Sequence, residues 1–374
     1  MEEKVGKKIK VCFFSPASYP FFDTDSKAAY GGAELQMFLL AKVLSLNSDS
    51  EICFLIGNYK VKDVKNKYNI KLISSINLKQ KESIFLKIFK SLKYFFCLTR
   101  LTPDLLISTN ANAVAGISAF YCKVFKKKFI YRTSSLIDVN QEYTKNNGLS
   151  GKLYQYGLRK ATKVITQNKE HQFLLKKNYN IDAVVLKNIF EVKEPENTNK
   201  EFILWVSRYH KLKRPDLFLK LAEHFTEKNF VMICPYNDSN KVDWQKLKEE
   251  ANKISNLKFI EKIPFREIQE YFNKAKLFIN TSDFEGFPNT FLQAAQGKTP
   301  VVSLNVNPDN FITEYNCGIF AEGNLEKLLS ETEKLLQNKA DLKIKGDNLF
   351  RYLQENHDIK IVGKQFKQFI ESVL

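Results

Sequence analysis

The sequence predicts an α/β protein of two doubly wound domains that face each other across a cleft. The chain has 374 residues, which at roughly 150 residues per domain suggests two domains. Short β-branched or aromatic runs alternate with longer helix-like stretches, a pattern typical of parallel sheets covered on both faces. The stretch 193–201 (KEPENTNKE) has one proline and no large apolar residue, so it is the predicted linker.

The first domain is expected at 1–192 and the second at 202–355. In the first domain, strands are predicted at 9–14, 51–56, 105–108, 128–131, 163–166 and 184–186, and helices at 33–46, 151–160 and 169–178. In the second, strands are predicted at 202–206, 230–234, 257–260, 276–280 and 300–303, and helices at 215–227, 242–255, 266–273 and 324–336.

The C-terminal segment 356–374 is predicted to hold an amphipathic helix from residue 359 onward. Ile359, Val362, Phe366 and Ile370 recur there at helical spacing. A return of this helix to the first domain is one arrangement that the pattern permits.

Composition indicates a folded cytoplasmic protein. With 44% apolar and 26% charged residues, the chain can bury sizeable cores and is not disordered. The opening residues MEEKVGKKIK resemble no secretory signal, and no run reaches the ~18 apolar residues of a membrane span. Six scattered cysteines and four histidines favour reduced, buried thiols and no metal site.

The charge balance favours anionic partners. The chain has 58 basic and 41 acidic residues, a net charge of +17, which suits nucleic acid, phosphorylated small molecules or an acidic membrane surface. The cations are dispersed and no RNA or DNA recognition signature is present, which argues against nucleic acid.

The loop after strand 9–14 is the first candidate site. Gly31 and Gly32 directly precede a helix, where free N–H groups attract phosphate, although for two glycines alone an ordinary helix-start turn is preferred. The same loop contains Asp23 and Asp25 in an Asp-x-Asp pattern. Because they lie within a long polar loop, solvation is preferred to metal binding.

The loop after strand 202–206 is strongly basic. Arg208, Lys211, Lys213 and Arg214 precede Pro215, which suits the first position of a helix. Such cations could hold a diphosphate through charge-assisted hydrogen bonds. A solvated basic turn is the alternative in so lysine-rich a chain.

The segment 281–303 carries the most specific pattern, with a strand, a loop, a short helix, a glycine and a strand. Glu285 precedes the helix start. A carboxylate beside an anion-binding helix end suits recognition of both hydroxyls and phosphates of an activated sugar. A capping role would explain Glu285 but not the whole segment.

These three segments, in this order, resemble the retaining, GT-B-fold glycosyltransferases of family four, also called group 1. Gly31–Glu34 resembles the family's glycine loop, Arg208 and Lys213 match its arginine–lysine pair, and 282–303 resembles its diagnostic segment. The resemblance covers essentially the full length. It implies catalytic roles for Glu285, Arg208 and Lys213, and donor binding by Gly31, Gly32, Gly286, Phe287, Pro288, Asn289, Thr290 and Gln293.

Two positions depart from the family pattern. The diagnostic segment normally has a second glutamate for the nucleotide ribose, and Gln293 stands there instead, although an amide can also hydrogen-bond a hydroxyl. Arg132 stands where the family often has a histidine near the acceptor. We expect Arg132 and the nearby Asp138 to bind the acceptor, and Asn188 to have a structural role.

The resemblance implies retaining transfer of a sugar from a nucleoside-diphosphate sugar to a hydroxyl of a glycan or polyprenyl-linked acceptor, in surface polysaccharide or glycoconjugate synthesis. A UDP-sugar is preferred over a GDP-sugar, without metal or cofactor. The alternatives are a non-catalytic nucleotide-sugar-binding protein and a basic nucleic-acid-binding protein.

The segment 84–98 is amphipathic. Its apolar residues Ile84, Phe85, Ile88, Phe89, Leu92, Phe95 and Phe96 share one helical face opposite Lys87, Lys90 and Lys93. A helix packed on its own sheet is preferred. Peripheral attachment to the inner face of the plasma membrane is the alternative, which the net charge supports.

Overall fold

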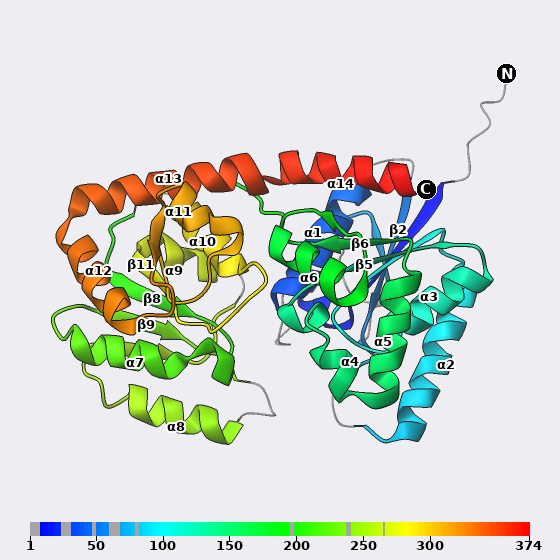
Figure 1. Ribbon diagram of the computed structural model, residues 1–374, viewed down its shortest axis with the longest axis horizontal. Coiled ribbons are helices and arrows are strands. Elements are labelled where there is room, and N and C mark those ends of the chain that lie inside the picture. The colour runs from blue at the N-terminus through cyan, green and yellow to red at the C-terminus, as the bar shows by residue number, and fades with distance from the viewer. Residues whose placement is uncertain are drawn as a thin grey trace. The chain divides into compact units, whose positions relative to one another are not determined.

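The computed structural model describes residues 8–23, 31–46, 50–59, 68–78, 82–194, 198–236, 241–264 and 266–374. It contains two compact units, each an α/β domain (Figure 1). The N-terminal unit comprises Met1–Ile189 and Ile359–Leu374, and the C-terminal unit comprises Phe190–Asp358.

The N-terminal unit contains a parallel seven-stranded sheet in the order β3-β2-β1-β4-β5-β6-β7. Its central strands are almost wholly buried because helices cover both faces of a parallel sheet. The strands are β1 (Ile9–Phe14), β2 (Ser50–Ile56), β3 (Ile70–Ser74), β4 (Leu105–Thr109), β5 (Lys128–Arg132), β6 (Lys163–Thr166) and β7 (Val184–Val185). The helices are α1 (Gly32–Ser45), α2 (Ile84–Leu101), α3 (Val114–Val124), α4 (Glu142–Asn146), α5 (Gly148–Lys160), α6 (Lys169–Tyr179) and α14 (Ile359–Val373), with 3₁₀ turns η1 (Pro16–Phe21) and η2 (Leu136–Asp138).

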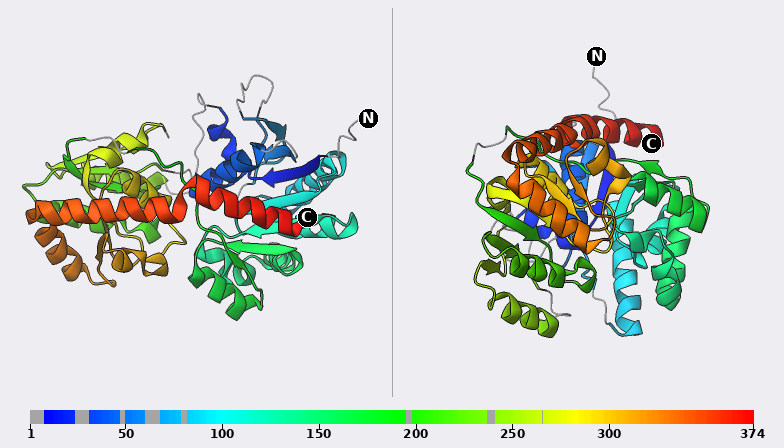
Figure 2. Two further views of the ribbon diagram at one scale, coloured as in Figure 1. Left: turned by 90° about the horizontal axis from the view of Figure 1, so that it is seen from above. Right: turned by 60° about the vertical axis from the view of Figure 1, so that its left-hand side comes forward.

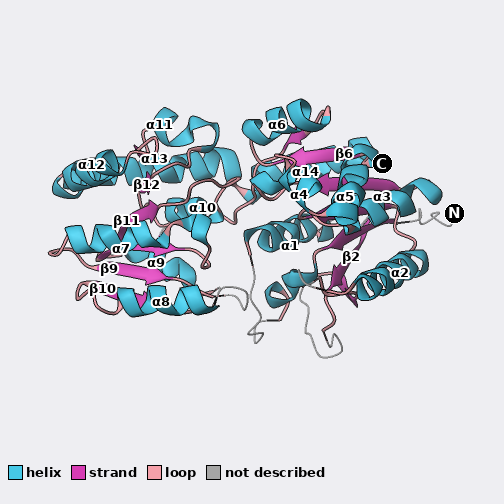
Figure 3. Ribbon diagram, turned by 60° about the horizontal axis from the view of Figure 1, so that its bottom comes forward, coloured by secondary structure: helices cyan, strands magenta, loops and turns pink. Residues whose placement is uncertain are grey.

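The C-terminal unit contains a parallel six-stranded sheet in the order β10-β9-β8-β11-β12-β13. Apolar clusters lie on both of its faces, one with α9, α10 and α13 and the other with α7, α8 and α12 (Figure 3). The strands are β8 (Phe202–Val206), β9 (Phe230–Ile233), β10 (Leu257–Ile260), β11 (Ala275–Asn280), β12 (Val301–Ser303) and β13 (Gly318–Phe320). The helices are α7 (Pro215–His224), α8 (Lys241–Ala251), α9 (Ile268–Lys274), α10 (Asn289–Gln296), α11 (Phe311–Glu314), α12 (Leu325–Gln337) and α13 (Lys339–His357), with 3₁₀ turns η3 (Lys211–Lys213) and η5 (Pro308–Asn310).

The division between the units falls at Ile189 and Phe190, three residues before the expected end of the first domain. Residues of the predicted linker are bonded to the C-terminal unit. Lys193 exchanges two backbone-to-amide hydrogen bonds with Gln296. The Lys200 ammonium donates to the carbonyl of Gly297 at 2.7 Å, and burial lowers the Lys200 pKa to about 8.

The C-terminal helix α14 belongs to the N-terminal unit, where it lies beside α1 (Figure 2). Gly363 allows the close approach, since a Cβ added there would meet the Val43 side chain at 3.2 Å. The first and last described elements, β1 and α14, therefore lie in the same unit.

Helix α2 contacts its unit through a different face from the one expected. Tyr94 and Leu98 are buried, whereas Phe85, Phe89 and Phe96 are 60–81% exposed. The apolar face identified in the sequence is therefore largely on the surface. The packed face instead uses Tyr94, whose hydroxyl hydrogen-bonds the buried Ser118 at 2.9 Å.

Candidate functional site

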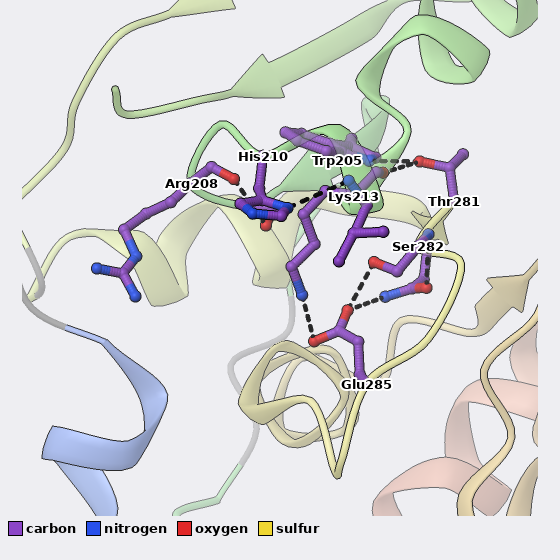
Figure 4. Close-up of polar contacts among 10 residues, drawn as sticks. Trp205, Arg208, His210, Lys213, Thr281, Ser282 and Glu285 are labelled. Atoms are coloured by element: carbon purple, nitrogen blue, oxygen red, sulfur yellow. Dashed lines mark hydrogen bonds and ion pairs between the residues drawn. The ribbon is translucent and has the colours of Figure 1, made fainter. Parts of the chain in front are cut away.

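Lys213 and Glu285 form an ion pair at the carboxyl ends of two neighbouring strands, β8 and β11 (Figure 4). The Lys213 ammonium lies 2.7 Å from Glu285 Oε2, and the two side chains are 25% and 17% exposed. Oε1 of Glu285 accepts hydrogen bonds from Ser282 Oγ at 2.7 Å and Asn280 Nδ2 at 2.9 Å. The carboxylate is thus fixed at both oxygens while part of its surface still reaches solvent.

The two loops that carry this pair are tied together by Thr281. Its hydroxyl donates to the Lys213 carbonyl at 2.8 Å and accepts from the Trp205 indole N–H at 2.9 Å. A second link runs from the Asp283 N–H to the Leu212 carbonyl at 2.8 Å. Because Trp205 and Thr281 are buried, these bonds fix the backbone of Lys213 relative to β11.

The environment of Glu285 keeps its carboxyl ionised. Burial by itself would raise the Glu285 pKa, but the Lys213 charge and the hydrogen bonds from Lys213, Ser282 and Asn280 outweigh it, so the pKa lies below its ordinary value. A carboxylate of this kind accepts hydrogen bonds and does not donate a proton at neutral pH.

Helix α10 begins at Asn289, four residues after Glu285, and the side chain of its N-cap residue, Pro288, makes no capping hydrogen bond. The helix start therefore presents backbone N–H groups beside the ion pair, an arrangement that favours anions. Phe287 and Pro288 are buried, and the Phe287 ring packs against His357 and Phe311. The other residues expected to bind donor here are Gly286, which is buried, and Asn289 and Thr290, which are half-buried.

Gln293 lies within α10 and is 9% exposed. Its carbonyl accepts a hydrogen bond from Gln269, but in the described part of the chain its side-chain amide makes none. The amide is thus available to a ligand, although the geometry does not test its expected contact with a ribose.

The other basic residues of the loop after β8 differ from Lys213 in their surroundings. Arg208 is exposed, and its guanidinium points away from the Lys213–Glu285 pair (Figure 4). Lys211 pairs with Asp243 at 3.4 Å, and Arg214 with Asp216 at 2.9 Å. His210 Nδ1 accepts the Leu212 N–H, and burial together with Lys213 and Arg208 lowers the His210 pKa. The structure therefore brings Lys213, but not Arg208, to Glu285.

Gly31 and Gly32 lie in the N-terminal unit, at the start of α1. Within this unit, an open pocket of about 1320 Å³ lies at the carboxyl ends of β1, β4 and β5. Its polar lining includes Glu34 of α1, whose carboxylate accepts a hydrogen bond from Asn110 at 3.3 Å. Ligands in open α/β sheets bind at such strand ends.

Arg132 and Asp138, expected to bind the acceptor, are instead buried, at 1% and 0% exposed. Arg132 Nη2 donates to Asn188 Oδ1 at 2.6 Å, and burial lowers the Arg132 pKa to about 10. The Asp138 carboxylate accepts from Tyr131 Oη and from the backbone N–H groups of Ser134 and Ser135, at 2.6–2.7 Å. These contacts are structural, so the geometry gives no support to acceptor binding by Asp138. The expected structural role of Asn188 agrees with its contact to Arg132.

The described residues contain no group of three His, Cys, Asp or Glu side chains that could hold a metal ion. Asp23 lies just after η1, with its N–H donated to the Tyr19 carbonyl, and Asp25 is outside the described residues. No described helix is both long and apolar enough to cross a membrane.

Comparison with known proteins identifies the class of enzyme. Residues 186–348 match the family model described as glycosyl transferases group 1. This chain is a glycosyltransferase, and its residues 186–348 are similar to that family. An uncharacterized glycosyltransferase of Methanocaldococcus jannaschii, MJ1069, is 23% identical over 314 residues, which cover 75% of this chain and 78% of that protein.

Solved structures show that this glycosyltransferase has the GT-B fold, as predicted. A sucrose-phosphate synthase from Thermosynechococcus elongatus superposes with a TM-score of 0.80 at 12% identity, covering 98% of this chain and 99% of the other. HepE from Anabaena, in complex with UDP and glucose, superposes with a TM-score of 0.73 at 13% identity, covering 97% and 100%.

Four residues of the site in this glycosyltransferase were not singled out from the sequence. They are Asn280 and Ser282, which hold the Glu285 carboxylate, and Trp205 and Thr281, which fix the loop of Lys213. The position of Asn280 as the last residue of a predicted strand was the available signal, because ligands gather at such ends. The hydrogen bond from Thr281 to Lys213 joins residues 68 positions apart, so no local sequence pattern predicts it.

Proposed function

We propose that this glycosyltransferase transfers a sugar, with retention at the anomeric carbon, from a nucleoside-diphosphate sugar to an acceptor hydroxyl. The observation that carries the proposal is the Lys213–Glu285 pair beside the start of α10. One side chain offers a cation to the diphosphate and the other offers an anion to sugar hydroxyls, within 2.7 Å of each other. A uridine nucleotide is preferred over a guanosine nucleotide, a preference that the UDP complex of HepE supports.

In this mechanism the main electrostatic problem is the charge that develops on the leaving diphosphate. Lys213, Arg208 and the backbone N–H groups at the start of α10 would stabilise that charge. The Arg208 side chain would have to turn from its present direction to take part. Glu285, ionised and fixed by Ser282 and Asn280, would orient the donor sugar by accepting hydrogen bonds from its hydroxyls.

The proton of the acceptor hydroxyl would pass to the departing phosphate oxygen on the same face of the sugar. Glu285 is unsuited to general-acid catalysis, because its lowered pKa leaves it without a proton at neutral pH. This assignment needs no metal ion, since fixed positive groups offset the phosphate charge.

The proposed acceptor is a glycan or a polyprenyl-linked glycan used in surface polysaccharide or glycoconjugate synthesis, at the cytoplasmic face of the plasma membrane. The pocket of the N-terminal unit supports an acceptor of this chemistry. Amide and hydroxyl groups of Asn110, Asn112, Ser134 and Ser135 line it, together with the Glu142 carboxylate. Such groups hydrogen-bond sugar hydroxyls.

The proposal is tested by thermal shift with a panel of UDP- and GDP-sugars, followed by nucleoside diphosphate release with excess EDTA present. We expect one UDP-sugar to raise the unfolding temperature, because a bound donor stabilises the folded state by mass action. We also expect turnover with an acceptor to survive chelation. Binding without turnover across an acceptor panel would favour a non-catalytic binder, and activity restored only by magnesium or manganese would contradict the metal-independent mechanism.

A further inference from the structure

Helix α2 presents a row of large apolar side chains to solvent. Phe85, Ile88, Phe89, Leu92 and Phe96 are 81%, 53%, 64%, 53% and 60% exposed. They recur at three- and four-residue spacing, so they lie along one side of the helix. A contiguous apolar surface of this kind on a folded protein marks an interaction site.

Helix α3 extends this surface. Phe120, Val124 and Phe125 at its C-terminal end are 50%, 52% and 44% exposed, and α2 and α3 lie side by side (Figure 1). Phe95 joins the two helices, because its ring lies 6.4, 6.1 and 6.3 Å from those of Phe96, Phe120 and Phe125. We call the exposed apolar residues of these two helices the α2–α3 face.

Cations predominate around this face. Neither α2 nor α3 contains an acidic residue. The exposed Lys93, Arg100, Lys123 and Lys126 form no ion pair in the part of the chain that the structure describes. By contrast, Lys90 pairs with Glu82, and Lys127 pairs with Asp104, so these two cations are already neutralised.

We propose that the α2–α3 face docks on an anionic lipid surface. Phenylalanine and leucine side chains enter the boundary between head groups and acyl chains, while the unpaired cations contact lipid phosphates. A second copy of the chain fits less well, because a twofold contact through this face would bring two basic rims together. An anionic lipid surface offers an acyl boundary to the apolar residues and phosphates to the cations around them.

This docking would also place the acceptor pocket close to the membrane. This part of the inference rests on the proposed function. Lys87, Ile88, Lys90 and Ser91 of α2 line that pocket. One helix thus borders both the lipid-facing surface and the polar pocket. A polyprenyl-linked glycan could keep its lipid in the membrane while its sugar enters the pocket of the same unit.

Co-sedimentation of the full chain with vesicles tests the docking. The vesicles are phosphatidylcholine alone, or phosphatidylcholine with about one quarter phosphatidylglycerol, at ionic strengths from about 0.05 to 0.5 M. We expect binding only with phosphatidylglycerol, and binding that weakens as salt rises. A Lys93→Gln/Lys123→Gln/Lys126→Gln variant should bind on the order of a hundredfold more weakly. The matched control is Lys220→Gln/Lys246→Gln/Lys253→Gln, exposed lysines of the C-terminal unit.

The apolar contribution is tested with Phe85→Ser/Phe89→Ser, which should weaken binding at least roughly tenfold. Phe173→Ser/Val242→Ser is its control, since these residues are 63% and 67% exposed elsewhere. Thermal unfolding should be unchanged in all four variants. Wild type that stays in the supernatant at the lowest salt would overturn the inference, as would self-association abolished by Phe85→Ser/Phe89→Ser without vesicle binding. Nucleotide-sugar binding, measured without vesicles, would be unaffected by that failure.

Discussion

The two units place charged side chains near the carboxyl ends of their sheets but surround them differently. In the N-terminal unit, Asp138 follows β5 and is wholly buried, with its carboxylate occupied by the hydroxyl of Tyr131 and by local backbone N–H groups. In the C-terminal unit, Glu285 follows β11, keeps 17% of its side chain exposed and pairs with Lys213.

We infer from this difference that the Asp138 carboxylate has a structural role and that the Glu285 carboxylate binds a ligand. The hydrogen bonds to the Asp138 carboxylate come from residues close to it in the sequence, Tyr131, Ser134 and Ser135. The cation that pairs with Glu285 instead belongs to Lys213, which lies in the loop after another strand and is 25% exposed. The side chains of Lys213 and Glu285 are both partly exposed in the folded protein. At Asp138 a ligand would first have to displace buried hydrogen bonds, which is costly.

The largest effect that we expect from this comparison is at the cation of the pair. Lys213→Ala should lower turnover roughly 10²–10³-fold, by analogy with the loss of one oxyanion donor. Lys211→Ala is the matched control, because Lys211 pairs with Asp243 at 3.4 Å and is 81% exposed. Initial rates of nucleoside diphosphate release measure the turnover of both variants. Equal losses of turnover would contradict a special role of Lys213.

The positioning of Lys213 by Thr281 should have an intermediate effect. Thr281→Val leaves the buried Trp205 N–H and the Lys213 carbonyl without their partner, at a cost of about 1–3 kcal/mol per group in unfolding free energy. Turnover should fall roughly tenfold as the Lys213 loop loosens. Thr281→Ser keeps the hydroxyl and should restore both values. A serine variant as impaired as the valine one would show that packing, not the hydrogen bond, matters.

The ionised state of Glu285 predicts a smaller, pH-dependent effect on stability. Because folding lowers the Glu285 pKa, its contribution is fully present above its unfolded value of about 4.3 and is lost as pH falls through the folded value. The unfolding free energy of the wild type should thus exceed that of Glu285→Gln by about 1 kcal/mol at neutral pH. Chemical denaturation should show this gap closing below about pH 4. A gap that widened on acidification would mean that the carboxyl is protonated in the folded protein.

The smallest effect is expected at Gln293. Its side chain makes no hydrogen bond within the described residues, and the family pattern has glutamate there. Gln293→Glu should change turnover less than roughly threefold, with a modest change in nucleotide affinity measured by calorimetry. A collapse of activity at this position would count against a conventional donor site.

The sequence predicted most of the architecture because strand runs and helix periodicity are local. Three of the missed elements have weak local signals: β3 is a partly exposed edge strand, β13 has three residues, and α3 (VAGISAFYCKV) is rich in residues that also favour strands. The long helix α13 was missed as well. At the site, residues could be predicted where a contiguous segment carried them, as at Glu285. The Lys213–Glu285 bond and the burial of Asp138 are set by tertiary packing, which no local pattern encodes.

The comparison of the two carboxylates is tested most directly by measuring turnover and unfolding free energy together for Glu285→Gln and Asp138→Asn. Both substitutions remove one charge and preserve shape. The account predicts that Glu285→Gln loses turnover roughly 10²-fold or more and about 1 kcal/mol of stability. Asp138→Asn should lose about 2–3 kcal/mol of stability while its folded molecules keep turnover within roughly threefold. The reverse result, an unstable Glu285→Gln beside a stable but inactive Asp138→Asn, would contradict it.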